Sequence, residues 1–403
     1  ADDGGGVVPP ADADPEDDEA RLLRAERHPL HLAGEELPIG RRGFGLHAAR
    51  IVRERMAAVR LLRAAPALFA ASLLAGSAPA QEPSRKGSIS AKAGVEKVLV
   101  DAHVLAPGGG TLLGLTPSDF LLQVGGEEVP VEDVEFVPAD RSELPRPPAG
   151  QAAEPGTPEF PDGRLIVLFF QADFGRYRVK GQMRMANEMV RFLDRLLPTD
   201  RVAVVSYDSH LKLRLDFTDD RKAIHRALFD TLKIGGAPDM PPPKPFPSLA
   251  AHLDVKEARA AANVERGLYV VAKALEKIPG GKSMFFLGWG LHVNRAPADW
   301  KWHALAVNAL QMARVNVFTL DVSDADWHTL EGTLRKLADL TGGTYAKTHV
   351  FSSQALDLAF RAIEGRYVVV FNRPDRPPGR HAIELTLRTK KGRVLARPFY
   401  DDP

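Results

Sequence analysis

The chain has 403 residues, of which 44% are hydrophobic and 26% are charged, a composition that allows two or three ordinary globular domains. Its formal net charge is only +1 at pH 7, and no basic stripe is interleaved with aromatic residues, so binding to nucleic acid or to an anionic membrane surface is not expected. The absence of cysteine excludes disulfides, thiolate catalysis and cysteine-based zinc sites.

An export signal is predicted at residues 56–80. Two arginines precede an apolar stretch at 64–75, and Ala78-Pro79-Ala80 follows as a small-x-small cleavage motif. The apolar stretch is too short to span a bilayer, which needs about 20 residues. A buried helix is a weaker interpretation, because no polar face recurs at helical spacing. The motif therefore predicts a periplasmic or secreted protein.

Residues 1–55 lie upstream of this signal. Because a signal peptide acts at an N-terminus, we interpret them as translation assigned too far upstream, with Met56 as the initiator. The alternative is a disordered cytoplasmic tail that precedes a signal anchor. In both interpretations no packed fold is expected before about Ser84.

Residues 95–137 are predicted to form a small β module. Valines alternate with polar residues from Val98, and Phe120–Val124 and Val129–Phe136 show two further strand patterns. Residues 138–162 are rich in proline, alanine and glutamate and are predicted to be an extended linker.

Residues 163–365 alternate between strand and helix patterns. The predicted strands are Leu165–Gln171, Arg201–Tyr207, Leu211–Phe217, Ser283–Leu287, Asn316–Asp321 and Thr344–Ala346. The predicted helices are Gly181–Leu197, Asp219–Leu232, Val255–Ile278, Trp302–Arg314, Trp327–Thr341 and Gln354–Glu364. Near-continuous apolar strands between helices predict an α/β fold with a doubly wound, mostly parallel sheet. The third strand follows the second so closely that it must pair antiparallel at an edge.

The sequence also predicts which residues begin and end several helices and where strands lie near the C-terminus. Thr218 and either Asp324 or Asp326 are expected as helix N-caps, and Gly342 as a helix stop. Residues 366–403 form a C-terminal β segment that we expect to pair with the N-terminal module. Its predicted strands are Tyr367–Asn372, His381–Arg388 and Val394–Tyr400.

Several segments in this order resemble a von Willebrand factor A-type domain. They are Leu165–Gly175, Arg201–Tyr207 and Leu337–Tyr345. The flanks Leu115–Phe120 and Val394–Tyr400 resemble a secreted bacterial subfamily of such domains. The resemblance covers most of the predicted mature chain and implies a Rossmann-like α/β fold. It also implies a metal-ion-dependent adhesion site, in which Asp-x-Ser-x-Ser, a middle-loop threonine and an aspartate after the fourth strand hold Mg²⁺ or Ca²⁺.

The ligand positions implied by this resemblance carry other residues. These residues are Gln171, Asp173, Gly175, either Ser248 or Asp239, and Trp289. A neutral amide and an indole are poor partners for a hard cation. The resemblance therefore implies a degenerate site, and no metal and no cofactor are expected.

The tryptophans of the chain all fall between Trp289 and Trp327, in segments that follow predicted strands. Loops at the carboxyl ends of parallel strands share one rim, where ligands bind. The predicted partner-binding residues are Gln171, Asp173, Gly175, Trp289, His292, Trp300, Trp302 and Trp327. One alternative is that the tryptophans only fill space. Another is a zinc site built from His292, His303 and His328, although these lack paired ligand spacing.

The sequence thus predicts an exported, non-enzymatic interaction protein that binds another protein or a cell-envelope component. One alternative is a structural scaffold whose β modules make the contacts. A second is a metal-dependent adhesion domain with divergent ligands. An enzyme is the least favoured class, because Asp173 is a lone candidate acid without a positioned partner.

Overall fold

The computed structural model describes residues 96–140, 161–172, 176–232, 241–292 and 297–402. The predicted signal peptide, the segment upstream of it and most of the predicted linker lie outside these ranges. Within the described part of the chain, no helix combines the length and the apolar character needed to cross a membrane.

A six-stranded sheet forms the centre of the α/β region, with the order β10-β9-β8-β5-β6-β7. Its strands are β5 (Leu165–Gln171), β6 (Arg201–Tyr207), β7 (Leu211–Thr218), β8 (Lys282–Gly288), β9 (Val315–Asp321) and β10 (Tyr345–Lys347). All neighbouring pairs are parallel except β6 and β7. The predicted antiparallel edge strand is therefore confirmed.

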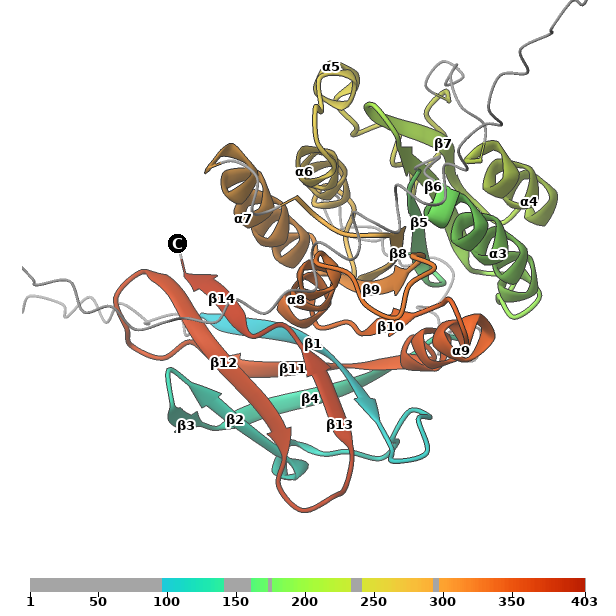
Figure 1. Ribbon diagram of the computed structural model, residues 1–403. Coiled ribbons are helices and arrows are strands. Elements are labelled where there is room, and N and C mark those ends of the chain that lie inside the picture. The colour runs from blue at the N-terminus through green and yellow to red at the C-terminus, as the bar shows by residue number, and fades with distance from the viewer. Residues whose placement is uncertain (1–95, 141–160, 173–175, 233–240, 293–296, 403) are drawn as a thin grey trace, which may run out of the picture. The chain divides into compact units, whose positions relative to one another are not determined.

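Helices pack against both faces of this sheet (Figure 1). They are α3 (Arg176–Leu193), α4 (Arg221–Asp230), α5 (Val255–Arg259), α6 (Val264–Leu275), α7 (Pro297–Met312), α8 (Glu331–Thr341) and α9 (Ser352–Ala362). Successive side chains of β5 point to opposite faces. Ile166 and Leu168 share a core with α3, α4 and α9, whereas Val167 and Phe169 share a core with α5, α6, α7 and α8.

One predicted helix is interrupted, and the predicted cap of α8 is wrong. The pattern at Val255–Ile278 contains two helices, because the Asn263 side chain accepts a hydrogen bond from the backbone of Arg266 and caps a new start. Helix α8 begins at Glu331 without any side-chain cap, so neither Asp324 nor Asp326 has the predicted role.

The residue that caps α4 differs from the predicted one, whereas α8 ends at the predicted glycine. Helix α4 is capped by Asp220, which accepts from the backbone of Lys222 and Ala223, and not by Thr218. The predicted stop at Gly342 is confirmed, since this glycine has a left-handed φ of 72°.

The remaining strands form two further four-stranded sheets, ordered β13-β1-β11-β4 and β14-β12-β2-β3. The strands before the α/β region are β1 (Lys97–Leu105), β2 (Phe120–Val124), β3 (Glu127–Val129) and β4 (Val131–Pro138), with a short 3-10 turn η1 at Pro117–Asp119. Those after it are β11 (Gly365–Asn372), β12 (Gly379–Leu387), β13 (Arg393–Ala396) and β14 (Phe399–Asp402).

Each of these sheets combines strands from both ends of the described chain. Strand β1 pairs with β11 and β13, and β2 pairs with β12. Side chains from both sheets, including Val100, Phe120 and Tyr367, share one hydrophobic core. The expected pairing of the C-terminal strands with the N-terminal ones is thus present, and the described N-terminal strands do not form a sheet of their own.

Prolines divide two segments that were predicted as single strands. Pro130 separates β3 from β4, and the Arg397-Pro398 step separates β13 from β14. Proline lacks the N–H that a continuous ladder requires. As a result, β13 and β14 belong to different sheets.

A cluster of buried charges connects β1 to the α/β region. Asp101 of β1 accepts two hydrogen bonds of 2.7 Å from Arg314, which precedes β9, and one of 3.1 Å from Arg366 of β11. Lys282, the first residue of β8, is 4% exposed and donates to the carbonyl of Ala313 at 2.9 Å. Asp101 therefore pairs with two arginines from separate segments, and its charge also acts on Lys282.

Candidate functional site at the strand-end rim

The candidate site lies where β5 and β8 end next to each other. In the sheet, β6 and β7 follow on the β5 side of this pair, and β9 and β10 follow on the β8 side. In open parallel sheets, ligands bind at the carboxyl ends of strands at such a reversal of strand order. Gln171 ends β5, and Trp289 follows β8 directly.

Gln171 is buried at 2% exposure and clamps the two strand ends together. Its Oε1 accepts from the backbone N–H of Trp289 at 3.0 Å and of Gly290 at 3.3 Å, and its Nε2 donates to the Gly290 carbonyl at 2.8 Å. A Cβ on Gly288 would lie 2.5 Å from Oε1, which explains the glycine there. The Gln171 amide is therefore engaged by the backbone that follows β8, and the predicted partner contact of this residue stays a prediction.

Trp289 is partly buried against the core on the α3 side of the sheet. The guanidinium carbon of Arg178 lies 3.6 Å from the centroid of its ring, a cation–π arrangement. The ring of His292 meets it edge-on, with centroids 5.0 Å apart. Its indole Nε1 is buried without a hydrogen-bond partner in the part of the chain that the structure describes.

A buried acidic side chain contacts the backbone of His292, one member of this aromatic pair. The backbone N–H of His292 donates to Glu265 of α6, a side chain with 0% exposure. Burial, followed by the charges of Glu265 and Asp208, raises the pKa of Tyr207 at the end of β6 to about 12. Tyr207 is therefore a neutral hydrogen-bond donor at physiological pH, and its hydroxyl donates to the Ala261 carbonyl at 3.3 Å.

A second acidic group ends β9. Asp321 is 1% exposed, and its Oδ2 lies 2.7 Å from His328 Nε2 and accepts from the Tyr345 hydroxyl at 2.9 Å. Its Oδ1 accepts from the Ser323 backbone at 3.0 Å. Burial and the Asp321 charge raise the pKa of Tyr345. Both carboxylate oxygens thus already have partners from the protein.

The other predicted rim residues do not all join this cluster. Trp302 packs against α6, 5.5 Å from the Tyr269 ring and 5.1 Å from the guanidinium carbon of Arg266. Trp327 is 71% exposed. The side chains of Asp173, Gly175 and Trp300 lie outside the described residues. Of the predicted set, the described contacts join Gln171, Trp289 and His292.

The remaining metal-ligand candidates have other roles. Ser248 donates its hydroxyl to Asp216 of β7 at 2.6 Å, which fixes the segment before α5. His303 is 5% exposed, and burial, followed by the charge of Lys336, lowers its pKa to about 4. Over the described ranges, no group of three or more histidine, aspartate or glutamate side chains is arranged to hold a metal ion. Asp239 lies outside those ranges.

Arg178, Glu265 and Asp321 were not predicted as parts of the rim. The position of Asp321 could have been predicted, since this residue was expected to end a strand at the same edge of the sheet. Arg178 and Glu265 lie on helices, and their approach to Trp289 and His292 depends on how α3 and α6 pack. No local motif marks either residue.

Comparison with known proteins gives only distant structural similarities. No protein-family model matches the sequence, and no curated protein resembles it significantly. Among solved structures, a von Willebrand factor type A protein from Catenulispora acidiphila shares 13% identity and a TM-score of 0.36 over 73% of this chain and 75% of its own. BatB from Bacteroides thetaiotaomicron shares 11% identity and a TM-score of 0.32 over 49% of this chain and 97% of its own. A PilB minor pilin mutant from Streptococcus sanguinis shares 10% identity and a TM-score of 0.35 over 49% and 60%.

Proposed function

We propose that this chain is an exported, non-enzymatic interaction protein that binds a protein or cell-envelope component through its strand-end rim. The sheet would be a doubly wound, von Willebrand factor A-type sheet whose adhesion site has lost its metal. The observation that carries the proposal is the arrangement around Trp289, where Gln171 fixes the backbone while Arg178 and His292 flank the indole. Aromatic and arginine side chains held in this way dominate binding energy in many interfaces.

The chemistry of the rim supports recognition without a cation. Mg²⁺ and Ca²⁺ bind through carboxylate, hydroxyl, carbonyl and water oxygens. Both hydrogen-bonding atoms of the Gln171 amide are engaged by backbone groups, and Trp289 contributes no oxygen. Arg178 also brings positive charge to the indole face, where a divalent cation would be repelled. The described residues therefore do not fit the metal that the family resemblance implies.

The same residues give little support to catalysis. A general acid or base needs a free titratable group within hydrogen-bond reach of a substrate. Glu265 is fully buried beneath His292, and Asp321 is enclosed by His328, Tyr345 and Ser323. Both carboxylates therefore form hydrogen bonds within the protein and hold the segments of the rim in place.

Capture of a partner from envelope extract by the full chain tests this proposal. Trp289→Ala should reduce capture at least about tenfold, because truncation of a central interface tryptophan commonly costs about 2 kcal/mol, which is about 30-fold in affinity. Leu113→Ala is the matched variant, because Leu113 is an apolar residue with 62% exposure outside the α/β region. It should bind like the unmodified chain. Thermal unfolding of both variants checks that they remain folded.

The reverse pattern would contradict the proposal. If Leu113→Ala loses capture while Trp289→Ala retains it, the β-sheets around β1 and β11 make the contacts and the rim is inert. If both variants capture the partner as well as the unmodified chain, neither surface contributes and the rim proposal also fails.

A further inference from the structure

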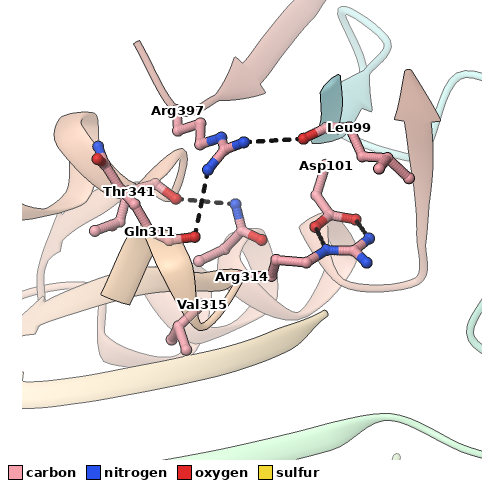
Figure 2. Close-up of a pocket in the computed structure, with 8 residues that line it drawn as sticks. Leu99, Asp101, Gln311, Arg314, Val315, Thr341 and Arg397 are labelled. Atoms are coloured by element: carbon pink, nitrogen blue, oxygen red, sulfur yellow. Dashed lines mark hydrogen bonds and ion pairs between the residues drawn. The ribbon is translucent and has the colours of Figure 1, made fainter. Parts of the chain in front are cut away.

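A second candidate binding site is a groove of about 330 Å³ at the opposite end of the six-stranded sheet. It lies beside Arg314, which precedes the first residue of β9, whereas the rim lies at the carboxyl ends of the strands. Residues of β1, the end of α7 and the C-terminal strands line it, among them Glu96, Leu99, Met312, Arg373, Arg397 and Asp402. Leu99, Gln311, Arg314 and Arg397 also line an adjoining hollow, in which Asp101 faces Arg314 (Figure 2).

Most charged groups around the groove already have partners of opposite charge. Asp101 is paired with Arg314 and Arg366, as described above. Arg373 contacts Glu96 and Asp402.

Asp401, the remaining carboxylate of the lining, has its own partner as well. It is paired with Arg380, whose Nε lies 2.9 Å from Oδ1. The acidic residues that line the groove are therefore all neutralised by arginines other than Arg397.

Arg397 differs from the other arginines of the groove. Its guanidinium donates to two neutral carbonyls, Leu99 at 2.9 Å and Gln311 at 3.4 Å, as Figure 2 shows. No carboxylate within the described ranges forms an ion pair with it. Burial lowers the pKa of Arg397, because lost hydration outweighs the attraction of the more distant Asp101. A partly desolvated guanidinium held by carbonyls retains unused capacity to bind an anion.

Apolar side chains accompany this arginine. Leu99 is 46% exposed and Met312 is 53% exposed, and both line the same groove. The volume lies at the small end of the range for ligand pockets, about 300–1,000 Å³. Such a site suits a short segment that carries one anionic group next to one apolar group.

We propose that this groove binds the chain end of a peptide, with Arg397 holding the terminal carboxylate and Leu99 and Met312 contacting an apolar last side chain. A carboxylate matches the fork of the guanidinium. Phosphate is a poorer match, because it carries no apolar group for Leu99 and Met312, which line the same groove. This site is independent of the rim, so the failure of one proposal leaves the other standing.

Fluorescence anisotropy of the full chain with two labelled peptides tests the groove. The probes are glycyl-alanyl-leucine labelled at its amino end, with either a free carboxyl or a C-terminal amide. The free acid should bind at least about tenfold more tightly than the amide, as expected for loss of a charge-assisted pair. Arg397→Gln should abolish this difference. Arg393→Gln, at an exposed arginine of β13, should retain it.

A second variant, Met312→Ser, tests the groove without changing Arg397. Met312→Ser changes an exposed side chain and should weaken binding of the free acid several-fold while preserving its advantage over the amide. Equal binding of acid and amide would overturn the proposal, as would the absence of saturation up to about 10 mM. Displacement of the peptide by inorganic phosphate at similar concentrations would also overturn it and would indicate a general anion site.

Discussion

At the carboxyl ends of β5 and β8 the neutral amide of Gln171 joins the two strand ends, whereas at the amino ends of β8 and β9 charged groups join separate segments. The amide is satisfied locally by the backbone of Trp289 and Gly290. At the other end, Lys282 and Arg314 lie near Asp101, which comes from a strand of a different sheet. Buried charge requires a counter-charge, and here that counter-charge comes from a distant part of the sequence.

This contrast separates stability from recognition. The charged end should be sensitive to any change in its shared anion, because removing it leaves cations without compensation. The amide end should show smaller losses of stability, since only hydrogen bonds to the backbone are involved. Binding should depend on the carboxyl ends of β5 and β8, where the Gln171 amide fixes the backbone of Trp289.

The largest expected effect is that of Asp101→Ala. It leaves Arg314 and Arg366 partly buried without their carboxylate, so the free energy of unfolding should fall by about 3–5 kcal/mol. Urea denaturation measures this change. Glu132→Ala, at an exposed acid on β4, is the control and should change stability by less than about 0.5 kcal/mol. Equal losses in the two variants would show that the cluster does not stabilise the fold.

Gln171→Ala should have the next largest effect. Its amide accepts from two backbone N–H groups and donates to one carbonyl in a buried site, so its removal should cost about 3 kcal/mol. Gln123→Ala, at a partly exposed glutamine of β2, should be nearly neutral. If Gln171→Ala unfolds at the same urea concentration as the unmodified chain, the proposed clamp is not needed.

The pH dependence of stability gives a smaller effect. Burial, followed by the charge of Arg314, lowers the pKa of Lys282 from 10.5 to about 7. The folded chain then binds fewer protons at this lysine than the unfolded chain does, so the free energy of unfolding should rise by about 2 kcal/mol between about pH 7 and pH 9.

Two lysine variants check this origin of the pH dependence. Lys282→Met should remove the rise, whereas Lys277→Met, at an exposed lysine, should leave it unchanged. Urea denaturation at several pH values measures both. A rise that persists in Lys282→Met would assign the pH dependence to another group.

Much of the α/β region was predictable from its strands. Leu165–Gln171 and Arg201–Tyr207 have the predicted bounds, because their seven and six consecutive buried residues leave clear apolar runs. The long pattern at Val255–Ile278 was misjudged, since the cap at Asn263 interrupts it without breaking helical periodicity. The division of β13 from β14 was missed although Pro398 marks it, and the sheet that each strand joins is a long-range property that the sequence pattern does not carry.

The site was less predictable than the fold. The contact of Gln171 with the Trp289 backbone follows from neighbouring strand ends, and both residues were predicted to lie on one rim. The burial of Gln171 was missed, because it depends on backbone N–H groups that point toward the amide after β8. The position of Arg397 was missed for a similar reason, since its contacts at Leu99 and Gln311 come from segments far apart in sequence.

The most direct test of the central claim is capture of the envelope partner by the unmodified chain, measured in parallel with EDTA and with excess Mg²⁺. Recognition through Trp289, Arg178 and His292 requires no cation, so the captured amount should be the same in both conditions. Loss of capture in EDTA that Mg²⁺ restores would contradict the account, because the rim around Gln171 would then still hold a metal.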